Sequence, residues 1–185
     1  MKRLLLATIF MAIVMSVTLA QADLMELTFT MEDFSAAIAP TPLPPPTDPV
    51  TGRIVYETDP ITAYIDSLIL IDLTIDGHTY QLSEVGFISP HTTSDHLIGG
   101  IVDGVNMCSS GKNDFWIGWN QDSLELISFV YTSSLYPYNA WGIDLDKDNY
   151  DLSLRELSAI PEPATLLFLG LGLISLVGVR KAIKK

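Results

Sequence analysis

The chain predicts an all-β fold, an antiparallel β-sandwich or a jelly-roll-like single domain, and three observations support this class. Short apolar stretches with a period of two recur along residues 23–160, separated by turn-forming residues. One of them ends in the dipeptide Asp76-Gly77, which suits a two-residue type I′ turn. No window between the two ends of the chain shows sustained helical periodicity. Short strands at this spacing are typical of packed antiparallel sheets.

The clearest single element is a hairpin at about residues 67–83. Every second residue of its first arm is a large aliphatic residue, which predicts a strand that buries one face. These residues are Ile69, Ile71, Leu73 and Ile75. The chain turns at Asp76-Gly77 and returns through residues 78–82.

The remaining strands are expected at residues 24–34, 52–58, 84–88, 97–102, 114–119, 124–132 and 150–157. Phe115, Ile117 and Trp119 share one face of their strand, which predicts that Trp119 belongs to the core. Residues 40–49 contain six prolines and cannot join the interior of a sheet. They predict a stiff, extended connection between the first strand and the rest of the domain.

The N-terminus has the three parts of a secretory signal peptide. Two basic residues precede an uncharged apolar run of 16 residues, 4–19. Ala20 and Ala22 then supply the small-x-small pattern that a signal peptidase accepts. Because the run is shorter than the roughly 20 residues of a membrane span, residues 1–22 are expected to be removed after Sec-type export.

The C-terminus has a second apolar run, placed between a short motif and a basic cluster. The motif is Pro161-Glu162-Pro163, and the run is residues 164–179, predicted to be a membrane helix because proline is favoured at helix starts. Its 16 residues make about 24 Å of helix against a hydrocarbon core of roughly 30 Å, which favours a transient stop over a lasting anchor. The basic tail, residues 180–185, is expected to stay cytoplasmic and to place the preceding chain outside. Its basic residues are Arg180, Lys181, Lys184 and Lys185.

In order and spacing, these C-terminal parts resemble the PEP-CTERM sorting domain, over residues 161–185. The resemblance implies recognition by an exosortase, a multi-spanning membrane enzyme, in a Gram-negative-type envelope. It implies an inner-membrane intermediate followed by delivery to the cell surface or the extracellular matrix. It also implies an association with exopolysaccharide or biofilm. It implies nothing about the activity of residues 23–160.

The exported part, residues 23–160, is strongly acidic. It has 21 acidic residues and four basic ones, a net charge of −17. A negative field of this size disfavours nucleic acid and anionic lipid as partners, and suits cation binding or neutral and basic partners. Cys108 is the only cysteine, so no intrachain disulfide forms. Its thiol is expected to be buried or inert, and an intermolecular bridge is the alternative.

One acidic loop has the alternation of a calcium site. Asp144, Asp146 and Asp148 alternate as calcium ligands do, but the sixth and twelfth positions of an EF-hand loop would be Asn149 and Arg155 instead of glycine and glutamate. The loop is therefore not an EF-hand. A solvated turn is the first interpretation, and a looser surface Ca²⁺ site is the alternative.

No catalytic motif stands out in the exported part. His91 and His96 lie in a polar loop and His78 lies elsewhere, so the spacing does not predict a zinc site. The sequence contains neither G-x-S-x-G nor H-E-x-x-H, although a Ser-His-Asp constellation assembled in space stays open. We therefore expect no enzyme, no catalytic residue, and no cofactor apart from the Ca²⁺ alternative.

Aromatic side chains supply a second functional hypothesis. Trp116 and the loop residues Tyr136 and Tyr138 are candidates for stacking on sugar rings. Three hypotheses follow from the sequence. The first is a non-enzymatic surface or matrix protein, the second is a carbohydrate-binding module, and the third is an envelope-tethered hydrolase.

Overall fold

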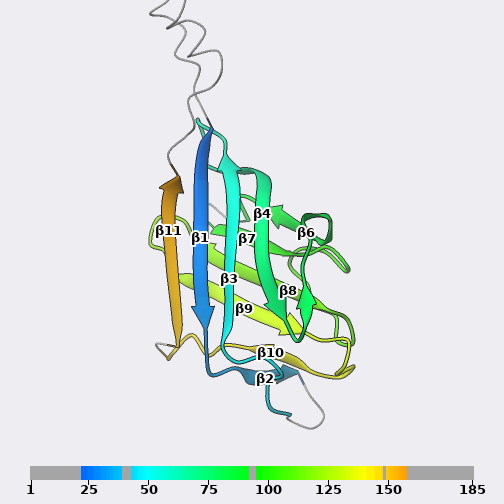
Figure 1. Ribbon diagram of the computed structural model, residues 1–185. Coiled ribbons are helices and arrows are strands. Elements are labelled where there is room, and N and C mark those ends of the chain that lie inside the picture. Colours follow the sequence, from blue (N-terminus) through cyan, green and yellow to red (C-terminus); the bar gives the residue numbers. More distant parts are fainter. Residues whose placement is uncertain (1–21, 39–42, 92–94, 148, 158–185) are drawn as a thin grey trace, which may run out of the picture.

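The computed structural model describes residues 22–38, 43–91, 95–147 and 149–157, which form two antiparallel sheets packed face to face (Figure 1). The five-stranded sheet has the order β11 (Tyr150–Leu157), β1 (Asp23–Met31), β3 (Val50–Thr58), β4 (Ile65–Ile75) and β5 (His78–Thr79). The six-stranded sheet has the order β2 (Ser35–Ile38), β10 (Ala140–Gly142), β9 (Leu126–Thr132), β8 (Asp114–Asn120), β7 (Asp95–Gly100) and β6 (Val85–Ile88). A 3₁₀ turn, η1 (Leu82–Glu84), precedes β6. The predicted all-β sandwich class is confirmed for the described residues.

The core between the sheets is rich in aromatic side chains. Phe129 from the six-stranded sheet lies 5.7 Å, ring centre to ring centre, from both Phe29 and Phe34. Phe115, Ile117 and Trp119 are all fully buried, so their predicted common face is the inward one. Burial of side chains of this size stabilises the fold by about 1.5–3 kcal/mol each.

The predicted hairpin is confirmed, with one correction to its buried face. Asp76 and Gly77 both have positive φ, 50° and 77°, as a type I′ turn requires. Leu73 and Ile75 are buried, but Ile69 is 44% exposed. The pairing of β3 with β4 shifts by one residue between Leu68 and Leu70, so a β-bulge turns Ile69 outward.

The prediction of one continuous strand over residues 24–34 is wrong. β1 ends at Met31, and the chain crosses to the other sheet, where β2 begins at Ser35. The crossing is held by the Asp48 carboxylate, which accepts hydrogen bonds from the Asp33 and Phe34 amides at 3.1 and 3.2 Å. Asp33 has a φ of 56°, so the strand conformation stops there.

The described part of the proline-rich segment, residues 43–49, is hydrogen-bonded to one end of the sandwich. The Tyr131 hydroxyl donates to the Thr47 carbonyl at 2.8 Å, and the Trp141 indole donates to the Leu43 carbonyl at 3.1 Å. The Asp76 amide donates to the Thr47 hydroxyl at 2.7 Å. The segment therefore covers the buried aromatic residues of β9 and β10 as well as connecting β2 to β3.

Two further strand limits and one further strand illustrate where the structure differs from the prediction. β7 ends at Gly100, which leaves Val102 exposed in the following loop. β9 begins at Leu126 because Leu124 has a φ of 57°, outside the strand region. β10 was not predicted, since three residues are too few to show a period of two.

Candidate functional site

The two ends of the domain meet at one end of the five-stranded sheet. In the antiparallel pairing of β1 and β11, Leu24 lies opposite Leu157, and on the other side of β1, Asp23 lies opposite Thr58. Figure 1 shows β1 beginning and β11 ending at this same end. Neighbouring strands are about 4.8 Å apart, so the chain enters and leaves the sandwich within one strand spacing.

The β3–β4 loop, residues 59–64, lies at this same end and has a defined shape. The Asp59 carboxylate accepts hydrogen bonds from the Ile61 amide at 2.9 Å and from the Thr62 amide at 2.7 Å. These hydrogen bonds, with that of the Thr62 amide as the largest cause, lower the pKa of Asp59. The loop holds Ile61 87% exposed at its tip.

A buried carboxylate lies on the outer face of the five-stranded sheet. Glu26 on β1 is 2% exposed because Arg53 on β3 and Arg155 on β11 cover it from both sides. Arg53 Nε lies 2.5 Å from Glu26 Oε2, and Arg155 Nε lies 2.5 Å from Glu26 Oε1. The hydrogen bond from Arg53 is the largest cause that lowers the pKa of Glu26. Two of the four basic residues of the exported part thus fix three adjacent strands to one another.

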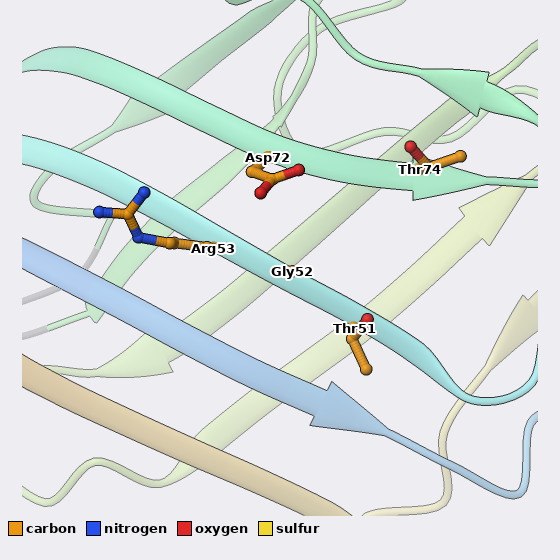
Figure 2. A pocket seen from close by; sticks show the side chains of 5 residues that line it. All are labelled: Thr51, Gly52, Arg53, Asp72 and Thr74. Atoms are coloured by element: carbon orange, nitrogen blue, oxygen red, sulfur yellow. The ribbon is translucent and has the colours of Figure 1, made fainter.

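Beside this cluster is a shallow hollow of about 380 Å³, lined by Thr51, Gly52, Arg53, Asp72 and Thr74. Figure 2 shows the Thr51, Arg53, Asp72 and Thr74 side chains on the two neighbouring strands β3 and β4. Arg53 lies opposite Asp72 in the pairing but turns to Glu26 on its other side. The lining offers hydroxyl, carboxylate and guanidinium groups to a hydroxyl-rich ligand, and it contains no aromatic ring for stacking.

The candidate sugar-stacking residues lie in different environments. Tyr138 is 69% exposed, whereas Tyr136 is partly buried with its ring edge against Trp141 at 5.4 Å. Trp116 is partly exposed on the outer face of β8, next to Gly118. Tyr138 and Trp116 are thus available on the surface, and Tyr136 serves packing.

The prediction that His96 lies in a polar loop is wrong, because His96 is part of strand β7 and is buried against a serine. Ser89 Oγ lies 2.7 Å from His96 Nδ1, and the other ring nitrogen is bonded to the side-chain oxygen of Gln121. His96 has no exposed surface, and burial lowers its pKa, which favours the neutral ring. An amide stands where a catalytic triad has a carboxylate. The arrangement connects Ser89, in the β6–β7 loop, through His96 to Gln121 in the β8–β9 turn. It also connects the loop to the start of β4, because Ser89 Oγ accepts a hydrogen bond from the Ile65 amide at 2.8 Å.

In the predicted calcium loop, one carboxylate is engaged by residues of the same turn. Asp144 Oδ1 accepts the Asp146 amide at 3.2 Å, and Asp144 Oδ2 lies 3.4 Å from Lys147 Nζ. Asp148 lies outside the described residues. Within the part of the chain that the structure describes, no group of three or more His, Cys, Asp or Glu side chains is placed to hold a metal ion.

The remaining singled-out side chains are Cys108 and the other two histidines. Cys108 is half-buried, and its thiol donates to the Val130 carbonyl at 3.6 Å. Burial raises the pKa of this thiol, as expected for an inert cysteine. His78 lies 3.5 Å from Glu84, and His91 is exposed.

Together, the geometry defines an acidic β-sandwich whose N-terminal and C-terminal flanks join it at adjacent strands. Residues 159–181 match the family model of the PEP-CTERM protein-sorting motif, so the C-terminal resemblance is confirmed. The motif implies export, processing by an exosortase-type membrane enzyme and sorting toward the cell surface. No curated protein and no solved structure matches the chain.

The sorting motif and both terminal apolar runs lie outside the described residues. This applies to residues 1–21 of the predicted signal peptide 1–22, with the cleavage residue Ala20, and to the helix predicted at 164–179, whereas the cleavage residue Ala22 is the first described residue. Among residues 22–38, 43–91, 95–147 and 149–157 there is no helix with the length and apolar character of a membrane span.

Proposed function

We propose that this chain is an exported, non-enzymatic surface or matrix protein whose acidic sandwich is delivered by exosortase processing of its tail. The observation that carries the proposal is the sorting motif at residues 159–181, which begins two positions after the last residue of β11. Three residues, 158–160, separate Leu157 from Pro161. Four Cα–Cα steps reach at most about 14 Å, so the motif stays close to the folded domain.

The position of the two flanks supports the same proposal. A signal peptide before Asp23 and a membrane segment after Pro163 would both leave the domain at the Leu24–Leu157 pair. Both segments then enter one membrane without unfolding any strand. The sandwich folds outside the cytoplasm while its two flanks are still in the bilayer.

A non-enzymatic role is supported by the surface chemistry of the described residues. The Glu26 carboxylate is held between two guanidinium groups, and the buried His96 ring is bonded to the partly buried Ser89 hydroxyl and to the Gln121 amide. The hollow on the five-stranded sheet is open and polar. These features suit a stable domain that presents a hydrophilic face to a neutral polysaccharide or to a surface layer.

A carbohydrate-binding module is the second candidate, and the observation that favours it is the exposure of Tyr138 together with the partial exposure of Trp116. An exopolysaccharide or biofilm matrix would supply the sugar. The loop that carries Tyr138 is anchored by the contact of Tyr136 with Trp141, so the exposed ring is presented from a fixed base.

Cell fractionation in the presence and absence of the exosortase tests the sorting proposal. The wild-type chain is expected to become shorter and to leave the inner membrane only when the enzyme is present. Pro161→Ala with Pro163→Ala is expected to keep the full-length form in the membrane. Pro60→Ala, in the exposed β3–β4 loop, is the matched control and should be processed normally. Identical size and location with and without the enzyme would overturn the proposal.

A further inference from the structure

Four residues with oxygen-bearing side chains line one hollow at the end of the β1–β11 pair that is opposite to the two flanks. Thr30 lies opposite Asp151 in the antiparallel register. One step further, the Glu32 amide donates to the Asn149 carbonyl at 2.9 Å, and Asn149 Nδ2 donates to the Glu32 carbonyl at 2.9 Å. Alternate residues of a strand share a face, and all four line one hollow of about 200 Å³ together with Tyr150.

One atom in this hollow's lining residues lacks a partner. Asn149 is 7% exposed, and its Oδ1 atom is buried without a hydrogen bond, although its Nδ2 atom is bonded. An amide oxygen taken out of water without a donor costs free energy. A positively charged partner would remove that cost.

The surroundings favour a cation over a neutral donor. Neither Glu32 nor Asp151 forms an ion pair within the described residues. The nearest basic residues along the chain are already engaged, Lys147 with Asp144 and Arg155 with Glu26. The net charge of −17 over residues 23–160 adds a long-range attraction for cations.

The donor atoms select the kind of cation. Two carboxylates, one amide oxygen and one hydroxyl are hard ligands, and neither histidine nor cysteine lines the hollow. Ca²⁺ accepts an irregular set of oxygen ligands completed by water, whereas Mg²⁺ demands a near-ideal octahedron.

We propose that Glu32, Asn149 and Asp151, with the Thr30 hydroxyl, bind one Ca²⁺ ion that links the end of β1 to the start of β11. The site is distinct from the Asp144–Asp146 turn and does not depend on the sorting proposal. Two carboxylates and neutral oxygens at a partly open site suit a dissociation constant of about 10⁻⁴–10⁻³ M, the range of extracellular calcium modules. Because β11 pairs only with β1 in the described sheet, the ion would stabilise the strand that precedes the sorting tail.

Calorimetric titration of the purified full chain in mild detergent with CaCl₂, and thermal unfolding with and without it, test this site. At a Ca²⁺ concentration ten times the dissociation constant, the folding equilibrium constant rises about 11-fold, and Tm rises by about 3–6 °C. Glu32→Gln and Asp151→Asn keep the side-chain shapes and are each expected to weaken Ca²⁺ binding at least tenfold.

Two matched variants keep the test specific. Asp72→Asn removes an exposed carboxylate from the same sheet face and should leave the titration unchanged. Asp146→Asn probes the neighbouring turn and should do the same. The proposal is overturned if the wild type shows no Ca²⁺-dependent heat and no Tm shift at 10 mM. It is equally overturned if Asp72→Asn or Asp146→Asn weakens binding as much as Asp151→Asn, or if Mg²⁺ reproduces the whole effect.

Without Ca²⁺, Asp151→Asn should be at least as stable as the wild type, because it relieves repulsion between Glu32 and Asp151. A lower Tm of this variant in chelator would mean that the carboxylate has a structural partner, and this result too would overturn the proposal.

Discussion

Gly52→Ala is expected to destabilise the sandwich through a single contact in its core. Gly52 lies opposite Phe29 in the pairing of β1 with β3. A Cβ atom at position 52 would lie 2.2 Å from Phe29 Cζ and 2.8 Å from both Cε atoms. These distances are far below the 3.5–4.0 Å of a favourable carbon contact. The Phe29 ring has little room to move, because it is 3% exposed and packs on Phe129.

The magnitude follows from two opposing effects. Overpacking of a well-packed core costs about 1–3 kcal/mol. Replacing glycine by alanine returns about 0.4–1 kcal/mol by restricting the unfolded chain. The matched control is Gly142→Ala on β10, where the nearest atoms to a new Cβ lie at 3.5 Å, an ordinary contact. Both variants gain the entropic effect, so their free energies of unfolding should differ by about 1–3 kcal/mol, the overpacking cost alone.

Urea unfolding followed by tryptophan fluorescence measures this difference, and a double mutant identifies its origin. Phe29→Leu shortens the side chain that meets the new methyl group, so Gly52→Ala should cost less in a Phe29→Leu background than in the wild type. Equal midpoints for Gly52→Ala and Gly142→Ala would refute the steric argument. An unchanged cost in the Phe29→Leu background would show that the strain lies elsewhere.

Two further predictions concern the protonation of the buried Asp114 and the binding of carbohydrate. Burial raises the pKa of Asp114 to about 6, despite the hydrogen bond that its carboxylate accepts from the Phe115 amide. The folded state therefore favours the protonated acid, and this contribution is full below about pH 4 and is lost as the pH rises through 6. Asp114→Asn should gain stability relative to the wild type between pH 4 and 6 in urea unfolding, and a constant difference across that range would count against the assignment. For the carbohydrate-binding candidate, the double variant Trp116→Ala with Tyr138→Ala should lose the glycan-array signals of the wild type, and the control Tyr64→Ala should keep them. Equal signals from the wild type, the double variant and the control would exclude these two side chains as the stacking surface.

The sequence predicts the local parts of this fold well. The Asp76-Gly77 turn and the inward face of Phe115, Ile117 and Trp119 depend on neighbouring residues only, and the structure confirms both. The crossing at Asp33 depends on the Asp48 side chain, 15 residues away in the sequence. Alternation along a strand shows which residues share a face, but it does not show which of two sheets the strand joins.

The polar clusters depend on pairing over still longer distances. Glu26 is bonded to residues 27 and 129 positions away, and Asn149 is bonded to Glu32, 117 positions away. From the sequence alone, an isolated acidic residue in a strand is predicted to face solvent. The one usable signal for Glu26 was the scarcity of basic residues, since two of only four lie in strands that flank β1. The alternating aspartates, by contrast, predict a calcium site in a turn where the Asp144 carboxylate already bonds to Asp146 and lies near Lys147.

Because the connection between β11 and the sorting motif is short, the folded domain is expected to lie close to the exosortase while the motif is bound. Insertion of six Gly and Ser residues between Leu157 and Ser158 extends the reach from Leu157 to Pro161 from about 14 Å to about 36 Å. If the sandwich crowds the enzyme, the insertion should speed conversion of the full-length form in a pulse-chase experiment, because no strand then has to lie against the enzyme. The same six residues inserted after Gly104, in the β7–β8 loop, are the control and should leave the rate unchanged. An unchanged rate with the insertion at Leu157 would show that about 14 Å is already enough for access, and that the domain does not control its own release.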